Sequence, residues 1–334
     1  YQALRSATKT VGQHLKPGTL VVIESTVAPG TTNKIVQPIL ESESGLKAGV
    51  DFLLACAPER VMPGKLLYNL VNLDRVIGGI NEESTRAAVE LYRHIVKGEL
   101  YPVDALTAEV VKTTENAYRD VQIAFANEIA LLCENIGVDV YTVRELVNKS
   151  PHRDMHLPGA GVGGHCLPKD SWLLAFGARG KHQPKLLSIA REINDGMPRH
   201  MAELCESALE AADRRVYGSK VTVLGMAYLE DSDDTRNSPA FTFIKALEVL
   251  GAQPTVHDPY VDNVDGVEIV KDLDEAITGS DCIALVTAHS QYRELDLDHI
   301  RQLMRTPVIV DGRKVFDKDE CLKKGFIFRG IGRS

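Results

Sequence analysis

Residues 221–259 read VTVLGMAYLEDSDDTRNSPAFTFIKALEVLGAQPTVHDP, and the pattern of apolar residues in this stretch changes from that of a strand to that of a helix and back to that of a strand. The apolar runs at 221–224 and 254–257 are typical of short buried strands, and 239–250 has the spacing of a helix that ends at Gly251. A strand, a helix and a second strand in this order predict a parallel sheet covered by helices. The stretch therefore predicts a doubly wound α/β domain.

The same alternation continues on both sides of this stretch. Further buried strands are predicted at 283–286 and 308–310 and, earlier in the chain, at 20–23, 52–55, 75–77 and 100–103. A helix is expected at 82–96, so the first part of the chain also has the pattern of a doubly wound parallel sheet. Because no strand with a glycine turn opens this first domain, we expect it to be incomplete, with its first β-α-β unit missing.

The middle of the chain is predicted to be helical. A long helix is expected to begin at Asp104, a good N-cap residue, and to end at Gly137, a good residue for a helix C-terminus. Further helices are expected at 140–148 and 185–213, separated by a loop at 150–170. An apolar stripe along the last of these helices fits either the domain core or a partner chain. The expected fold is α/β: two Rossmann-like parallel-sheet domains (1–103 and 216–334) joined by a central helical domain with a long helix (104–215).

Composition limits the partners of the protein. The chain has 334 residues, with 38 Lys and Arg against 46 Asp and Glu, which gives a formal net charge of −8. An acidic balance argues against nucleic acid as the main partner, because phosphate binding needs clustered basic residues. No apolar run is long enough for a membrane span. The six cysteines are widely spaced and form no CxxC pair, which is typical of reduced thiols in a cytoplasmic protein.

The strongest local signal is PGAGVGGHCLPKD at residues 158–170. Its glycines allow close approach of the backbone to a ligand, and the free N–H groups of such a loop can bind anions. Cys166 follows this loop directly and has reason to be reactive, although simple packing of the thiol is the alternative. A metal site formed by His152, His156, His165 and Cys166 is a weaker interpretation, because no helix fixes the first two histidines, and we expect no metal.

Two further groups of residues have functional potential. Lys112, Asn116 and Arg119 are spaced to lie on one face of the long helix, and a solvated polar face is the alternative. Thr26 and Glu59 each follow a predicted strand, and ligands of such sheets bind at the carboxyl ends of the strands.

The connection at 225–239 lies between the first strand and the first helix of the second α/β domain. It lacks the GxGxxG fingerprint of dinucleotide binding. Arg236 has the chemistry to hold a phosphate, with an ion pair to the neighbouring aspartates as the alternative. Ser238 before Pro239 is a good N-cap pair, and His257-Asp258-Pro259 is expected to do no more than turn the chain.

Taken together, these motifs resemble the UDP-sugar 6-dehydrogenases, and in particular the branch that acts on UDP-N-acetylhexosamines such as UDP-N-acetyl-mannosamine or UDP-N-acetyl-glucosamine. The resemblance extends over nearly the whole chain. It rests on Ser25 to Thr31, Ala57 to Val61, Lys112 with Asn116, Asn127-Glu128, Pro158 to Asp170, Asp233 to Pro239, and Asp311-Gly312-Arg313. Several ordered motifs at matching separations are a strong signal.

The resemblance implies a mechanism and a cofactor. Cys166 would be the nucleophile that forms a thiohemiacetal and then a thioester at C6, and two NAD⁺ would be consumed per substrate. Lys112 would act in proton transfer, Asn116 would hold an oxygen, and Asp170 would position water, with Thr26 and Glu59 assisting. The resemblance assigns substrate contacts to Arg60, Val61, Arg119, Arg153, Gly163 and Arg313, and NAD contacts to Thr26 and Arg236. The central helices would form the core of a homodimer or a higher homo-oligomer.

The sequence departs from the family pattern at several positions, and other functions remain open. Tyr228-Leu229 stands where relatives carry Phe-Lys, and Pro63 stands where the UDP-glucose branch has a second glutamate. His152-Arg153 is one residue out of register with the His-Pro-Arg of the branch. The alternatives are a UDP-glucose-type enzyme, a hydroxyacid dehydrogenase that needs no cysteine, a hydrolase using Cys166 and His165, and a UDP-binding fragment without catalysis.

Overall fold

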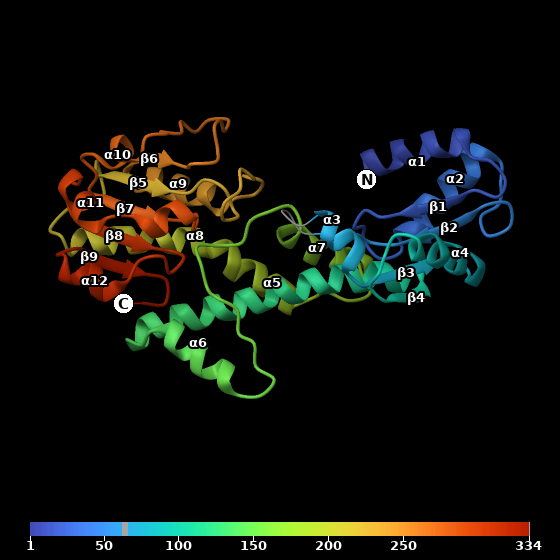
Figure 1. The fold of residues 1–334 in the computed structure, drawn as a ribbon, viewed down its shortest axis with the longest axis horizontal. Helices are drawn as coiled ribbons and strands as arrows, with labels where there is room; N and C mark the ends of the chain where they lie inside the picture. Colours follow the sequence, from blue (N-terminus) through green and yellow to red (C-terminus); the bar gives the residue numbers. More distant parts are fainter. Residues whose placement is uncertain (62–65, 334) are drawn as a thin grey trace. The chain divides into compact units, whose positions relative to one another are not determined.

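The computed structural model describes residues 1–61 and 66–333, and the chain forms two compact units. The first unit contains Tyr1–Tyr118 and Lys169–Pro184, and the second contains Arg119–Pro168 and the residues from Lys185 onward. Figure 1 shows the order of the helices and strands along the chain. The helices of the middle region are divided between the two units, and domain boundaries after residues 103 and 215 remain a prediction.

The sheet of the first unit has the order β1-β2-β3-β4, formed by β1 (Leu20–Ile23), β2 (Leu53–Cys56), β3 (Arg75–Gly79) and β4 (Leu100–Asp104). The pairs β1–β2 and β3–β4 are parallel, as expected, but β2 and β3 are antiparallel. The expectation of parallel strands is therefore wrong at this one pair. The physical reason for the antiparallel pair is the path of the connection between β2 and β3, which contains the short helix α3 (Leu66–Asn72). The chain leaves β2 and enters β3 at the same edge of the sheet, so the two strands run in opposite directions.

Helices cover both faces of this sheet (Figure 1), and they are α1 (Gln2–His14), α2 (Gln37–Ser44), which continues from the π-helical turn η1 (Thr32–Val36), and α4 (Glu82–Arg93). Side chains of β1 alternate between the two faces. Leu20 and Val22 pack into the apolar cluster that includes α4, while Val21 and Ile23 pack into the cluster that includes α1 and α2. The sequence of β1 thus builds both halves of the core of this unit.

The central helices are α5 (Ala105–Ile136), α6 (Val140–Lys149), α7 (Leu167–Gly177) and α8 (Leu186–Glu210). The caps of α5 are as predicted: the Asp104 carboxylate accepts a hydrogen bond from the N–H of Thr107 at 2.9 Å, and Gly137 has φ +82°. The expected loop at 150–170 is wrong for its last four residues, which begin α7. Pro168 does not prevent this, because a proline in the first turn of a helix leaves no hydrogen bond unmade.

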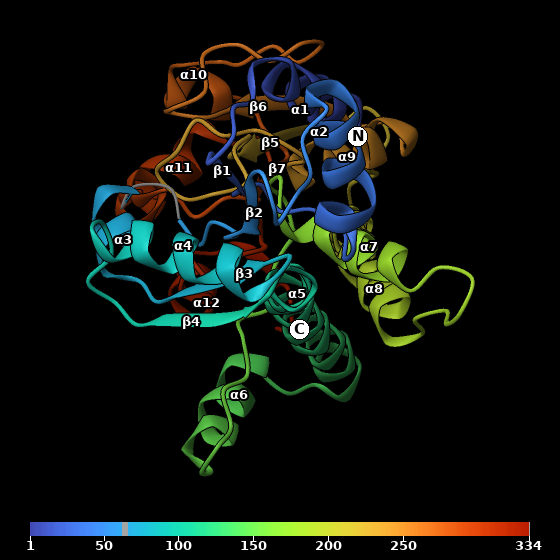
Figure 2. The ribbon, with the colours of Figure 1, turned by 90° about the vertical axis from the view of Figure 1, so that its right-hand side faces the viewer.

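The second unit contains a fully parallel sheet in the order β6-β5-β7-β8-β9 (Figure 1). Three of its strands, β5, β6 and β7, are labelled in the turned view of Figure 2. Its strands are β5 (Lys220–Leu224), β6 (Gln253–His257), β7 (Cys282–Leu285), β8 (Val308–Asp311) and β9 (Ile327–Gly330). On β7, Cys282 and Ala284 face one apolar cluster and Ile283 and Leu285 face the other. The doubly wound fold expected from 221–259 is therefore confirmed, and β9 is a strand that the sequence did not indicate.

The helices of the second sheet are α9 (Pro239–Val249), α10 (Leu273–Ile277), α11 (Leu297–Leu303) and α12 (Lys318–Lys323), with a 3₁₀ turn η2 (Ser290–Glu294). α9 begins as predicted, because the Ser238 hydroxyl accepts a hydrogen bond from the N–H of Ala240 and Pro239 occupies the first turn. In the described part of the chain, no helix has the length and the apolar character needed to cross a membrane.

Candidate active site

Two of the residues predicted to be catalytic are joined directly in the first unit. Asn116, on α5, donates a hydrogen bond from Nδ2 to Oδ2 of Asp170, on α7, at 2.5 Å. Asp170 is fully buried, and its other oxygen lies 3.3 Å from Nζ of Lys169. Lys112 lies one helical turn before Asn116 on the same face of α5 and is half-buried. The first unit therefore brings an amide and a carboxylate into contact beside a lysine.

Glu59 and Arg60 follow the carboxyl end of β2. Oε2 of Glu59 accepts a hydrogen bond from Nη2 of Arg75 at 2.8 Å, and Oε1 accepts one from the N–H of Arg60 at 2.7 Å. The Arg60 guanidinium forms an ion pair with Glu115 and also donates to the carbonyl of Asp74 at 2.9 Å. Arg60 thus has protein partners, and Arg75 is a residue of this region that sequence reasoning did not identify.

The loop that carries Thr26 is fixed to α5 by a buried carboxylate. Glu109 accepts hydrogen bonds from the N–H of Gly30 at 2.5 Å and from both the N–H and the hydroxyl of Thr32 at 2.7 Å. Burial raises the pKa of Glu109, and the hydrogen bonds of Thr32 and Gly30 act in the opposite direction. Glu109 lies one turn before Lys112, so the Thr26 loop and Lys112 are held by the same stretch of helix.

The glycine-rich loop at 158–166 belongs to the second unit and is held at its backbone. Oδ1 of Asn127, on α5, accepts a hydrogen bond from the N–H of Gly159 at 2.9 Å. Arg313, after β8, donates from Nη2 to the carbonyl of Gly161 at 3.0 Å and from Nε to the carbonyl of Val286 at 2.9 Å. Arg313 was predicted to contact substrate, and the structure places its guanidinium against the backbone of the loop.

The end of the glycine-rich loop lies against the connection after β5. The N–H of Gly164 donates to the carbonyl of Arg236 at 2.8 Å, and Nδ2 of Asn237 donates to the carbonyl of Gly164 at 3.1 Å. A Cβ at Gly163 would lie 2.5 Å from Cβ of Tyr228, and Gly164 has φ +88° beside the Tyr228 ring. Glycine is thus required at both positions, by close approach at the first and by backbone conformation at the second.

Cys166 is the exposed member of the six cysteines, all of which lie in the described residues and are free thiols. It directly precedes α7, and Asp170 follows four residues later in the first turn of that helix. Asp234 is the main cause that raises the pKa of Arg236, and the charge of Cys166 contributes in the same direction.

The remaining arginines predicted to bind ligands lie at the surface. Arg236 is exposed and forms an ion pair with Asp234 at 2.6 Å, which is the alternative that the sequence left open. Arg153 is exposed and donates only to nearby carbonyls of its own loop among the contacts that the structure describes. Arg119 is exposed on α5 and Val61 is half-buried. Pro63 and its neighbours Met62 and Gly64 lie outside the described residues.

The sequence 257–259 does more than turn the chain, so the expectation for it is wrong. Asp258 is fully buried and accepts hydrogen bonds from the N–H groups of Met226 and Ala227 and from Nε2 of His289. Burial acts to raise the pKa of Asp258, but these hydrogen bonds outweigh it and lower the pKa well below the usual range. Nδ1 of His289 in turn accepts a hydrogen bond from the N–H of Asp231 at 2.9 Å. Asp258 and His289 together therefore fix the turn after β5, Asp258 at Met226 and Ala227 and His289 at Asp231.

The histidines of the competing metal interpretation are not gathered. His156 pairs with Gln122 at 3.2 Å, while His152 and His165 are exposed. Across residues 1–61 and 66–333, no group of three or more His, Cys, Asp or Glu side chains is arranged to hold a metal ion.

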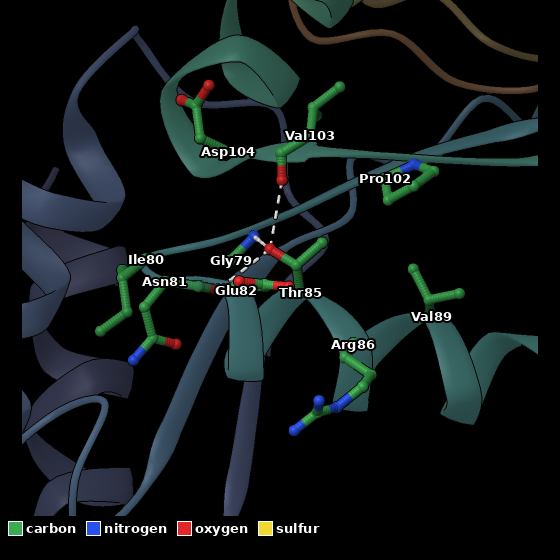
Figure 3. Close-up of a pocket in the computed structure, with 10 residues that line it drawn as sticks. All are labelled: Gly79, Ile80, Asn81, Glu82, Thr85, Arg86, Val89, Pro102, Val103 and Asp104. Atoms are coloured by element: carbon green, nitrogen blue, oxygen red, sulfur yellow. Dashed lines mark hydrogen bonds between the residues drawn. The ribbon is translucent and has the colours of Figure 1, made fainter.

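A separate pocket of about 570 Å³ lies in the first unit at the ends of β3 and β4 (Figure 3). Thr85 accepts a hydrogen bond from the N–H of Gly79 and lies within hydrogen-bonding distance of the carbonyl of Val103, so it joins α4 to both strands. The predicted site residues do not line this pocket. Gly79 is separated from Arg75 by about 13 Å of extended strand, so the pocket is remote from Glu59.

Comparison with known proteins gives matches along the chain. Residues 1–96, 106–196 and 222–318 match the NAD binding domain, the central domain and the UDP binding domain of the UDP-glucose/GDP-mannose dehydrogenase family. A UDP-N-acetyl-D-mannosamine dehydrogenase of Pyrococcus horikoshii is 44% identical over 330 residues, which cover 99% of this chain and 76% of the relative. Its counterpart in Escherichia coli K12 is 34% identical, covering 94% of this chain and 77% of the relative. The crystal structure of an NDP-N-acetyl-D-galactosaminuronic acid dehydrogenase from Methanosarcina mazei Go1 matches with a TM-score of 0.94 and 46% identity, covering 99% of this chain and 73% of that chain.

Proposed function

Because the chain belongs to the UDP-glucose/GDP-mannose dehydrogenase family and is an NAD-dependent oxidoreductase, we propose that it oxidises the C6 alcohol of a UDP-N-acetylhexosamine to a carboxylate. The relatives compared above are named for N-acetylmannosamine and N-acetylgalactosaminuronic acid, which supports an N-acetylhexosamine over glucose. UDP-N-acetyl-D-mannosamine is the first candidate substrate.

One observation carries this proposal. Asp170 lies in the first turn of the helix that Cys166 precedes, and its carboxylate is hydrogen-bonded to Asn116, one turn from Lys112. A thiol, a carboxylate, an amide and an ammonium are the groups that a two-step oxidation through a covalent intermediate requires.

NAD⁺, when bound, accepts a hydride in each of the two oxidations. Residues at the carboxyl end of the parallel pair β1–β2 fit such a ligand, because Ser25 is exposed and Thr26 is only half-buried there. Cofactor contacts are proposed for Thr26 and for Arg236. The cofactor contact of Arg236 would replace or extend its present ion pair with Asp234.

The chain's own residues then act on the sugar. Lys112 acts in the transfer of the C6 hydroxyl proton in the first oxidation, and its ammonium form stabilises negative charge on the oxygen, while Asn116 donates a hydrogen bond to the same oxygen. The Cys166 thiolate adds to the aldehyde carbon, and the aldehyde oxygen is protonated to give a thiohemiacetal. The thiohemiacetal then loses the hydride on C6 and its hydroxyl proton to become a thioester. Water then adds to the thioester carbonyl, the C–S bond breaks, and the carboxylate leaves as the thiolate of Cys166 is restored. Asp170 positions this water and Glu59 assists.

The rest of the assignment completes the site. We propose substrate contacts for Arg60, Val61, Arg119, Arg153, Gly163 and Arg313, of which Arg313 acts through the glycine-rich loop that it holds. The segments 1–103, 104–215 and 216–334 would be the NAD-binding, central and UDP-binding domains. We propose a cytoplasmic homodimer or higher homo-oligomer built on the central helices.

The proposal is tested by NADH formation with the full-length protein. UDP-N-acetyl-D-mannosamine, its gluco and galacto isomers and UDP-glucose are compared, and two NADH per sugar are expected from the preferred N-acetylhexosamine. Cys166→Ser should abolish turnover, while Cys133→Ala, which changes a buried thiol of α5, should retain it. Turnover that survives both Cys166→Ser and thiol alkylation would favour a hydroxy-compound dehydrogenase instead. UDP binding without NADH formation would favour a non-catalytic role.

A further inference from the structure

Arg75 opposes Glu59 because of the antiparallel strand pair in the first unit. Cys56 of β2 pairs with Gly78 of β3, and continuing this register by three residues brings Arg75 opposite Glu59. Nη2 of Arg75 lies 2.8 Å from Oε2 of Glu59. A parallel arrangement of β3 would have put Arg75 at the other edge of the sheet, so the contact depends on the strand direction that sequence reasoning missed.

The two partners of this ion pair differ in exposure. The Arg75 side chain is 3% exposed and the Glu59 side chain is 32% exposed. The Arg75 guanidinium lies 5.2 Å from the centre of the Tyr92 ring, whose hydroxyl donates to Glu24. Nε and Nη1 of Arg75 are buried and make no hydrogen bond to the described residues. Glu59 is thus the carboxylate that compensates a buried positive charge, while part of its own surface faces outward.

The Glu59 carboxylate is also fixed in orientation. One oxygen accepts from Arg75 and the other accepts from the N–H of Arg60, while the backbone N–H of Glu59 donates to the carbonyl of Glu24 at 3.0 Å. An ionised carboxylate offers about four acceptor positions, and these bonds use two of them. The remaining positions on a partly exposed carboxylate are available to a water molecule.

We propose that Arg75 is a positioning residue for the hydrolytic step of the reaction. Arg75 holds Glu59 so that its carboxylate accepts a proton from the water that attacks the Cys166 thioester. In this step the water oxygen bonds to the acyl carbon, the C–S bond breaks with its electrons on sulfur, and the released proton passes through Glu59 to solvent. The inference rests on the proposed function, since it names the step of that reaction in which Arg75 acts.

The test is rapid-quench kinetics with intact-mass analysis of the full-length protein, using UDP-N-acetyl-D-mannosamine and NAD⁺. Arg75→Met should keep the initial burst of NADH and the KM for the sugar. Its steady-state turnover should fall by about 100-fold, while a UDP-uronyl adduct accumulates on Cys166. Arg75→Lys should restore part of the turnover, because an ammonium can pair with one oxygen but lacks the planar fork of arginine.

Two comparisons separate positioning from folding. Glu59→Gln keeps Arg75 and should accumulate the same adduct, so it tests the step even if Arg75→Met does not fold. Arg93→Met removes the exposed ion pair of Arg93 with Glu90 in the same unit and should leave burst and turnover unchanged. The inference is overturned if Arg75→Met, Arg75→Lys and Glu59→Gln lower burst and turnover together, or if none of them accumulates adduct. If the unaltered protein forms neither NADH nor adduct, the proposed function itself fails, whatever the variants do.

Discussion

Asn116 on α5 and Asp170 on α7 share a hydrogen bond of 2.5 Å although 54 residues separate them in the chain. Asp170 is fully buried, so its carboxylate depends on this amide and on the nearby Lys169 for compensation of its charge. The contact connects the helix that carries Lys112 with the helix that begins after Cys166. The hydrogen bond therefore joins two of the residues to which the proposed chemistry gives a role, and both belong to the first unit.

Asp170→Asn should lower turnover by about 100-fold with little effect on thermal stability. Asparagine has nearly the same shape as aspartate and can still accept a hydrogen bond from Asn116. It lacks the negative charge and the second acceptor oxygen with which the Asp170 carboxylate would position the attacking water. Turnover is measured by NADH formation, and the midpoint of thermal unfolding serves as the folding control. Turnover within twofold of the unaltered protein would exclude a role for the Asp170 charge.

Glu109→Gln should destabilise the protein by about 1–3 kcal/mol, because an amide nitrogen would then face the buried donors of Gly30 or Thr32. The same change should weaken NAD⁺ binding, since Glu109 fixes the loop that carries Thr26. Thermal unfolding and a cofactor titration measure the two effects. Glu128→Gln changes an exposed glutamate of the same helix and should alter neither. Equal stability of both variants would show that the Thr26 loop is held by other contacts.

Stability should depend on pH through His200. Burial acts to lower the pKa of His200, but its contacts with Glu134 and Glu203 outweigh this effect and raise the pKa. A histidine with a raised folded-state pKa stabilises the fold fully below the unfolded pKa of about 6.5, and this stabilisation is lost as pH rises through the folded value.

The difference in urea midpoint between the unaltered protein and His200→Gln should therefore be larger at pH 6 than at pH 9. His299→Gln is the matched control, because His299 pairs with Asp274 at the surface. A difference that stays constant or grows between pH 6 and pH 9 would contradict the charged pair of His200 with Glu134.

Local signals predicted much of the fold. Asp104 and Ser238 cap the helix N-termini that the sequence predicted, and Gly137 ends the long helix with a positive φ. These helix ends could be predicted because each depends on only a few neighbouring residues. Val221 to Leu224 shows the apolar run of a buried parallel strand, and β5 is that strand. The antiparallel direction of β3 was not predicted, because strand direction depends on the path of the connection rather than on local pattern.

The sequence did not identify residues whose contacts are with partners far away in the chain. Arg75 reads as the first residue of a strand, and its contact with Glu59 follows only from the register of β2 and β3. Glu109 and Asp258 read as ordinary acidic residues, and each collects backbone donors from a loop far away in the sequence. Cys166 was a candidate from its place after the glycine-rich loop, and Lys112 and Asn116 were candidates from their spacing on one helix face. Their roles and that of Asp170 come from the family resemblance and remain predictions.

The central claim is that Cys166 bonds covalently to the sugar during turnover. Its direct test is acid quench of the full-length protein with UDP-N-acetyl-D-mannosamine and NAD⁺, followed by proteolysis and mass spectrometry of the peptide that contains Cys166. We predict a peptide heavier by the UDP-linked acyl group in the unaltered protein and no such peptide in Cys166→Ala. Full turnover by Cys166→Ala, or an adduct on a different residue, would contradict the mechanism.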